Sequence, residues 1–137
     1  MNRGRQSLSA RDRKKLIDRL QSDNRIVAAY LLGSAASGML RPDSDIDVAI
    51  LPQKGMRLRR SHLLELSTSV SLALGREIDL GVLSSANLVY ARQAILAGTR
   101  LFTKDPFYSD LMETTLLSMY LWFSEERKEI VDAYRTR

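Results

Sequence analysis

The stretch LLGSAASGMLRPDSDIDVAI at residues 31–50 decides which fold the sequence predicts. An apolar strand from about Ile26 to Leu32 runs into a Gly-Ser turn, and the chain returns as a second strand that carries Asp45 and Asp47. Side chains alternate along a strand, so these two carboxylates share one face and stand about 7 Å apart at the backbone. Such a pair of hard oxygen ligands can converge on Mg²⁺ ions that lie between the protein and a substrate phosphate.

A plainer interpretation of the same stretch is an acidic turn followed by a half-buried strand, because aspartate is common in turns. The fixed spacing of ten residues between the Gly-Ser pair and the Asp-x-Asp pair makes this less convincing. The motif also lies between two predicted strands, where a catalytic motif of this kind must lie. We therefore favour catalysis.

A third carboxylate comes from the stretch REIDLGVL at residues 76–83, which also alternates between polar and apolar residues. Ile78, Leu80 and Val82 form an apolar face, and Asp79 lies on the opposite face. If this strand is a neighbour of the strand that carries Asp45 and Asp47, all three aspartates emerge on one side. Clustered carboxylates repel each other unless cations neutralise them, which predicts a metal site. Taken alone, Asp79 is equally well explained as a solvent-facing strand residue.

A Gly-Ser turn, an Asp-x-Asp pair and a third acidic residue on a later strand resemble the DNA polymerase β superfamily of nucleotidyltransferases. The short length and the segment at residues 118–130 resemble its minimal members, the MntA-type antitoxins of HEPN/MNT toxin–antitoxin systems. The resemblance extends from about Ile26 to the C-terminal helix. It implies an α/β (α+β) fold, in which a small mixed β-sheet is flanked by helices and followed by a long C-terminal helix.

The resemblance also implies a function, namely transfer of AMP from ATP to a tyrosine hydroxyl of a cognate HEPN RNase toxin, which is thereby neutralised. The implied catalytic residues, which would also hold two Mg²⁺ ions, are Asp45, Asp47 and Asp79. The implied nucleotide-binding residues are Gly33, Ser34 and Ser44. Two alternatives stay open: a non-catalytic antitoxin that acts by binding and occlusion, and a small-molecule nucleotidyltransferase of the aminoglycoside-modifying type. Enzymes of the second kind are usually longer, with a further domain that shapes the acceptor pocket.

Composition narrows the class of protein. A chain of 137 residues suits a single domain spanning residues 1–137 with a genuine hydrophobic core. The absence of cysteine excludes disulfides and thiolate metal sites, and the lone His62, expected at the surface, makes a poor zinc ligand. No apolar run approaches 18 residues, and the first basic residues are not followed by the apolar stretch that a signal peptide would have. We therefore expect a soluble, cytoplasmic protein with no membrane partner.

The net charge of +5 arises from the first 20 residues, which hold seven basic residues, Arg3 and Arg5 among them, and two acidic ones. The rest of the chain is neutral. This segment, with a helix predicted from a Ser9 cap to about Gln21, permits direct nucleic-acid binding. No aromatic residue interleaves the charges, so a solvated helix face is the favoured interpretation.

Further elements follow from hydrophobic spacing and from glycines that end helices. Helices are expected at about 59–74, before Gly75, and at about 86–97, before Gly98, with a short edge strand at 100–103. One long helix is expected at about 106–135. Its residues expected to pack on the sheet are Phe107, Leu111, Leu116, Met119, Tyr120, Phe123, Ile130 and Tyr134. Leu117, Leu121 and Trp122 then remain on other faces, which indicates either a wide buried face or a partner-binding helix, and the family resemblance favours the partner.

Overall fold

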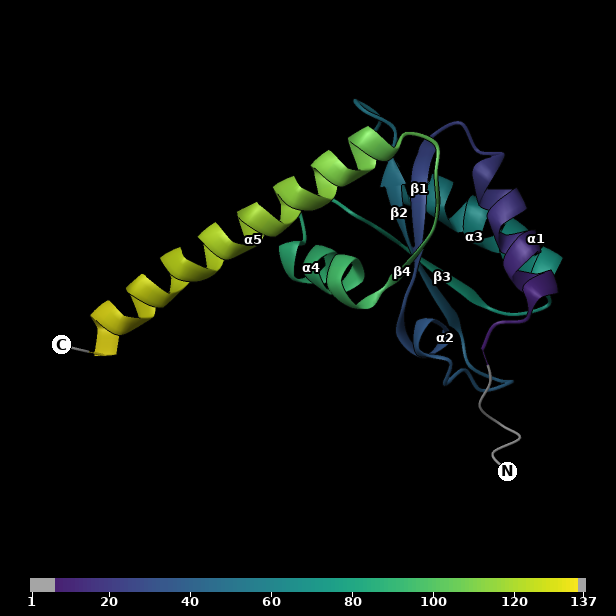
Figure 1. Ribbon diagram of the computed structural model, residues 1–137, viewed down its shortest axis with the longest axis horizontal. Helices are drawn as coiled ribbons and strands as arrows, with labels where there is room; N and C mark the ends of the chain where they lie inside the picture. Colours follow the sequence, from purple (N-terminus) through teal and green to yellow (C-terminus); the bar gives the residue numbers. More distant parts are fainter. Residues whose placement is uncertain (1–6, 136–137) are drawn as a thin grey trace.

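The computed structural model describes residues 7–135, in which four strands form one mixed sheet (Figure 1). The strands are β1 (Ile26–Leu31), β2 (Ile46–Pro52), β3 (Ile78–Val82) and β4 (Thr99–Thr103), and their order across the sheet is β3-β2-β1-β4. β1 is antiparallel to both β2 and β4, whereas β2 and β3 are parallel. All six residues of β1 are buried, as its unbroken apolar sequence predicts for a central strand.

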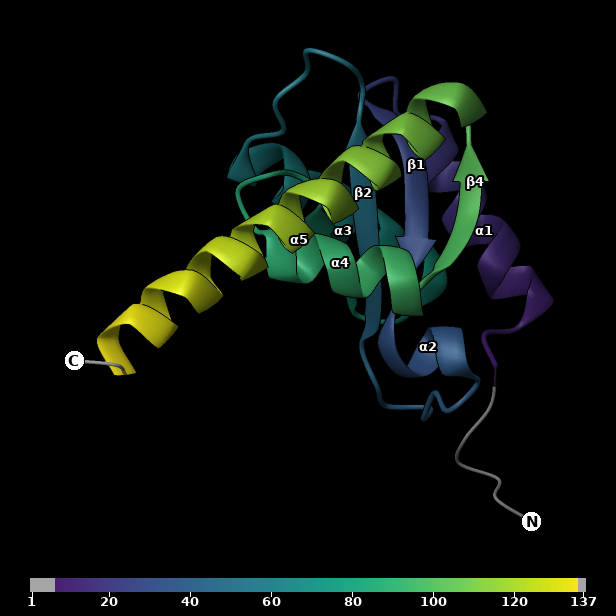
Figure 2. The ribbon, with the colours of Figure 1, turned by 60° about the vertical axis from the view of Figure 1, so that its left-hand side comes forward.

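Helices cover both faces of the sheet (Figures 1 and 2). On one face lie α1 (Ala10–Gln21) and α3 (Arg60–Leu74), and α3 also makes the crossover that a parallel β2–β3 pair requires. On the other face lie α4 (Leu88–Ala97) and the beginning of α5 (Pro106–Arg135). The short helix α2 (Gly33–Ser37) follows β1 directly. The mixed sheet, the flanking helices and the long last helix match the fold class expected from the sequence.

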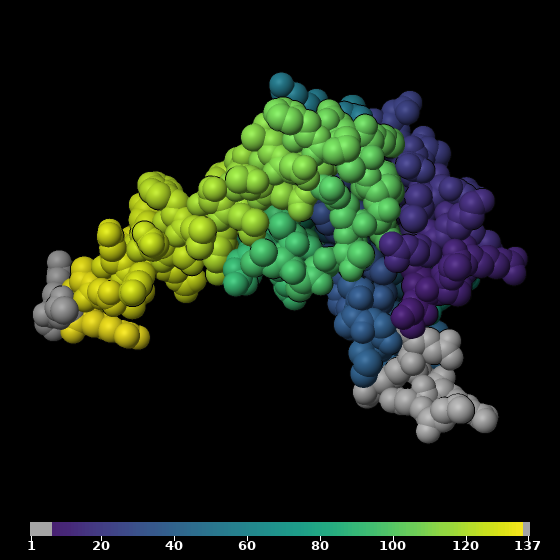
Figure 3. All heavy atoms as spheres, viewed as in Figure 1, coloured from purple at the N-terminus to yellow at the C-terminus, as the bar shows by residue number. Residues whose placement is uncertain are grey.

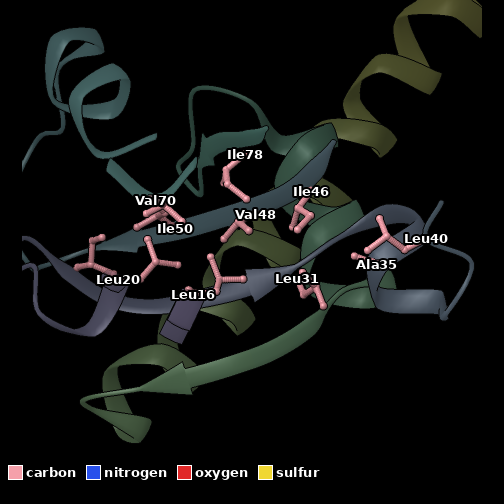
Figure 4. Packing of buried hydrophobic residues seen from close by; sticks show 12 residues of the cluster. Leu16, Leu20, Leu31, Ala35, Leu40, Ile46, Val48, Ile50, Val70 and Ile78 are labelled. Carbon is pink, nitrogen blue, oxygen red and sulfur yellow. The ribbon is translucent and has the colours of Figure 1, made fainter. Parts of the chain in front are cut away.

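Alternation along β2 divides the core between these two faces. Ile46, Val48 and Ile50 point towards α1 and α3, where they pack with Leu16 and Leu20 of α1 (Figure 4). Ala49 and Leu51 belong instead to the cluster under α4 and α5. Asp47 has the same strand parity as Ala49, so its carboxylate emerges on the α4 side of the sheet.

Helix boundaries follow the local signals in the sequence. The Ser9 side chain accepts a hydrogen bond from the backbone N–H of Asp12 at 3.1 Å, which caps α1 as expected. Gly75 ends α3 in the left-handed conformation, with φ of 69°, which glycine adopts without strain. The long helix begins at Pro106 and reaches Arg135, as the sequence predicts.

The packing predicted for α5 is mostly wrong. Among the eight residues expected to lie on the sheet, Leu116 is buried, but Phe107 and Tyr134 are 80% and 71% exposed. For Tyr134 the cause is length, because a helix of 30 residues spans about 45 Å, whereas strands of five to seven residues span about 17–23 Å. The second half of α5 therefore projects past the sheet (Figures 1 and 3). Length does not explain Phe107, which is the second residue of α5 and lies on the exposed side of its first turn.

Three smaller expectations concern His62, the basic N-terminal segment and membrane-spanning helices. His62 is half-buried on α3, which differs from the surface position expected of it. Arg3 and Arg5 of the basic segment lie outside the described residues. Within residues 7–135, none of the helices combines the length and the apolar character needed to cross a membrane.

Candidate active site

The Gly-Ser turn lies directly against the first carboxylate strand. Gly33 has φ of 60°, a left-handed conformation that a larger residue would adopt only with strain. A Cβ at Gly33 would also stand 3.3 Å from Oδ2 of Asp47. The backbone N–H of the preceding residue, Leu32, donates a hydrogen bond to the backbone carbonyl of Asp47 at 2.9 Å. Glycine at position 33 thus allows the first turn of α2 to approach the Asp47 side chain.

Asp47 and Asp79 are direct partners in the parallel β2–β3 pair. The third strand is therefore a neighbour of the second, which is the condition that the sequence analysis set for the aspartates to lie together. Asp45 precedes β2 by one residue, and it is exposed, as is Asp79. Burial raises the pKa of the half-buried Asp47, and the negative charges of Asp79 and then Asp45 raise it further. Asp79 and Asp45 are thus close enough for their charges to act on Asp47.

The chemistry of these donors fits a divalent cation, because carboxylate oxygens are hard ligands and a cation would relieve the repulsion at Asp47. Mg²⁺ is usually bound by one or two carboxylates together with substrate phosphates, so these residues need not form a complete site by themselves. Within residues 7–135, no group of three or more His, Cys, Asp or Glu side chains is arranged closely enough to hold a metal ion. The structure brings Asp47 and Asp79 together, whereas Asp45 adds its charge from the edge of the pair.

A pocket of about 300 Å³ opens over this pair, between the sheet and α4. Asp47 and Asp79 line one wall. Small residues of α4 and the following turn line the opposite wall, so the pocket stays open where the helix crosses the sheet. The full lining is Leu32, Gly33, Asp47, Asp79, Leu80, Gly81, Tyr90, Gln93, Ala94, Ala97 and Gly98. Among the sequence-predicted residues, Gly33, Asp47 and Asp79 line it, and Ser34, Ser44 and Asp45 do not.

Tyr90 is a pocket residue that the sequence analysis missed. Its hydroxyl lies over Gly81, where a Cβ would collide with it. Burial, together with smaller contributions from the charges of Asp79 and Asp47, raises the pKa of Tyr90 to about 12. Asn87, the N-cap of α4, accepts from the Tyr90 N–H at 3.1 Å and so fixes where the helix begins. The Asn87 cap was the available signal, because it places Tyr90 in the first turn of a helix that follows the Asp79 strand.

Arg76 was also missed. Its Nη2 donates to the backbone carbonyls of Arg41 at 2.6 Å and Ser44 at 2.7 Å. The Ser44 N–H itself donates to the Arg41 carbonyl at 3.1 Å, which closes a turn just before Asp45. Arg76, two residues before β3, therefore holds the loop that leads into Asp45. No local pattern predicts this contact, because the two partners are more than 30 residues apart.

Comparison with known proteins agrees with this geometry. Residues 14–107 match the family described as "Polymerase beta, Nucleotidyltransferase". This chain belongs to that family. The matched residues of the nucleotidyltransferase include the Gly-Ser turn, the three aspartates and the pocket between the sheet and α4.

The nucleotidyltransferase is 31% identical over 118 residues to the protein adenylyltransferase MntA of Shewanella oneidensis, across 85% of this chain and 83% of that protein. Its fold is similar to a crystal structure of a toxin–antitoxin with AMP-PNP, with a TM-score of 0.76, 29% identity and coverage of 90% of this chain and 98% of the other. It is also similar to the MNT antitoxin in complex with the tri-AMPylated HEPN toxin of Shewanella oneidensis. That likeness has a TM-score of 0.71, 27% identity and coverage of 90% and 96%.

Proposed function

We propose that this protein is an antitoxin that transfers AMP from ATP to a tyrosine hydroxyl of a cognate HEPN RNase toxin and so neutralises it. The observation that carries the proposal is the pairing of Asp47 with Asp79 beside the Gly33 turn, inside one pocket. The 31% identity to a protein adenylyltransferase supports the choice of reaction. The likeness to an antitoxin bound to a tri-AMPylated HEPN toxin supports the choice of acceptor.

The first turn of α2 would hold the triphosphate. The leading N–H groups of a helix have no acceptor within the helix, and they favour negative charge. Here the residues that offer them are Gly33, Ser34 and Ala35. We assign the β- and γ-phosphates to these N–H groups and to the Ser34 hydroxyl. Ser44, whose backbone belongs to the turn before Asp45, would support the nucleotide from the other side of the loop.

Asp45, Asp47 and Asp79 would hold two Mg²⁺ ions, which polarise the phosphate oxygens and neutralise their charge when bound. A tyrosine hydroxyl has an ordinary pKa near 10, so its attack at neutral pH needs a group that accepts the proton. Asp79 is exposed and lines the pocket, which suits it to accept that proton. Attack opposite the departing pyrophosphate would then place the AMP group on the tyrosine.

We also propose that residues 1–137 form one domain in which α5 binds the toxin. Met119, Trp122 and Phe123 of α5 line a groove of about 530 Å³ with Leu88 of α4. Trp122 is 71% exposed. Large apolar side chains gathered on a projecting helix are typical of a surface that another protein covers.

The test is the intact mass of the HEPN toxin after incubation with this protein, ATP and Mg²⁺. We expect a gain in whole AMP units, mapped to tyrosine, and no gain with the Asp45→Asn/Asp47→Asn double variant. That variant should still bind the toxin, because neither aspartate lies on α5. If the toxin stays unmodified but is still bound and inhibited, the antitoxin acts by occlusion and not by AMP transfer. Modification of aminoglycosides and not of the toxin would indicate the small-molecule enzyme.

A further inference from the structure

The pocket is lined by residues from both ends of α4, which crosses the sheet (Figure 2). Near the beginning of α4, the Tyr90 hydroxyl lies over Gly81 of β3. Just after the end of α4, Gly98 lies against Leu31, the last residue of β1, and Leu32. Gly33 of the Gly-Ser turn therefore lines the pocket on the β1 side and Tyr90 lines it over β3, and Asp47 and Asp79 line it as well.

Tyr90 is placed differently from the other tyrosines of the chain. Tyr30 is buried in β1, and Tyr108, Tyr120 and Tyr134 belong to α5. Tyr90 lines the pocket, and the charges of Asp47 and Asp79 act on its hydroxyl. The hydroxyl fits because position 81 has no Cβ. The geometry thus places a phenol in the same pocket as the pair of carboxylates, on the side away from the phosphate-binding turn.

We propose that Tyr90 is itself an acceptor of AMP, so that the protein adenylylates its own pocket. This inference rests on the proposed function, because ATP must bind with its triphosphate at the α2 turn. In the reaction the Tyr90 Oη forms a bond to the α-phosphorus of ATP, and the bond from that phosphorus to the α,β-bridging oxygen breaks. Pyrophosphate leaves at the α2 end, and the phenolic proton passes to Asp79. Gly81, under the Tyr90 hydroxyl, belongs to β3, whereas the α2 turn follows β1, and β2 lies between these two strands. The nucleophile and the leaving group are thus kept apart, which an in-line displacement needs.

The experiment measures covalent AMP on the purified full-length chain after incubation with ATP and Mg²⁺, without any toxin. We expect a mass gain of one AMP unit, retention of label from α-phosphate-labelled ATP, and mapping of the label to the peptide that contains Tyr90. Tyr90→Phe should lose the gain, and Asp47→Asn should lose it too. Tyr120→Phe is the matched control, because the Tyr120 ring, on α5, packs under Arg92 of α4 and lies outside the pocket. The Tyr120→Phe variant should be labelled as the parent protein is.

Several outcomes would overturn the proposal. They are an unchanged mass, a label mapped to another residue, and a label that persists in a Tyr90→Phe variant whose thermal melt matches that of the parent. Site mapping in the parent protein keeps the test decisive even if that variant folds poorly. The HEPN toxin is incubated in parallel to separate the two proposals. Modification of the toxin alone rejects Tyr90 as an acceptor and leaves the proposed function standing, whereas modification of neither protein rejects both.

Discussion

At the scale of single residues, Asp47 is where function and stability oppose each other. Its pKa is raised by burial and by the neighbouring charges of Asp79 and Asp45. A raised pKa in the folded state means that ionisation of Asp47 lowers stability. Stability therefore falls as the pH rises from the ordinary carboxyl pKa near 4 to the raised pKa of folded Asp47. It is regained when the pH falls over the same range.

We predict that Asp47→Asn lowers AMP transfer by roughly 100-fold or more and raises the melting temperature at pH 7. The gain in melting temperature should disappear near pH 4, where the parental carboxyl group is protonated as well. Thermal melts between pH 4 and pH 8 measure this. Asp43→Asn, in the exposed loop before β2, is the matched control and should change neither quantity. A variant that is less stable than the parent at pH 7 would contradict the electrostatic interpretation.

Arg76 acts on the site through the backbone of its neighbours. A guanidinium that donates to two carbonyls makes charge-assisted bonds, and Arg76 is half-exposed, so we expect Arg76→Met to cost about 1–2 kcal/mol. Transfer should fall about tenfold, because the loop that delivers Asp45 loses its support. Hydrogen exchange of the amides at residues 41–45 should accelerate more than exchange in β1. Arg76→Lys should recover part of the activity.

Arg57→Met provides the control for Arg76, because it removes an exposed cation from another loop without touching those carbonyls. Equal losses of transfer in the Arg57 and Arg76 variants would mean that total positive charge matters, and that the contact with the loop does not.

At the scale of elements, one cation ties the edge strand to the long helix. Arg100 of β4 donates from Nη1 to Asp110 and to Glu113 of α5, at 2.8 Å each. The Arg100 side chain is 34% exposed, so solvent weakens both pairs. We predict that Arg100→Met lowers the free energy of unfolding by about 1 kcal/mol, and that 1 M salt removes most of the difference. Chemical denaturation at low and high salt measures it, and a difference that salt leaves unchanged would point to lost packing.

The sequence predicted elements better than it predicted contacts between them. Alternation placed Asp79 on the polar face of its strand, and the ten-residue spacing singled out Gly33 and Asp47, which both line the pocket. Both signals are local in the sequence. Tyr90 and Arg76 escaped prediction, because their roles depend on how α4 crosses the sheet and where a distant loop runs. The packing of α5 was wrong for a related reason. Periodicity shows that a helix has an apolar stripe, but it does not show whether the sheet, α4 or another protein covers it.

At the scale of the whole molecule, the pocket with its carboxylates lies on the sheet, and the second half of α5 projects away from it (Figure 3). That half of α5 also carries exposed apolar side chains. Leu121 and Trp122 are 64% and 71% exposed, although neither serves the pocket at the carboxylates. A toxin whose tyrosine enters that pocket must also be held while transfer takes place. The α5 surface would provide this hold from outside the reaction site.

We predict that Trp122→Glu weakens binding of the HEPN toxin by about 2 kcal/mol or more, which is near 30-fold in Kd, because buried tryptophans dominate interfaces. Thermal stability should change by less than about 0.5 kcal/mol, since the side chain is exposed in the isolated protein. Leu72→Glu is the matched control, because Leu72 is 80% exposed on α3, on the opposite side of the sheet. Calorimetric titration with the toxin measures both variants. Equal binding by the two would remove α5 from the interface, whereas loss confined to Trp122→Glu, with transfer reduced in proportion, would show that docking on α5 precedes chemistry in the pocket.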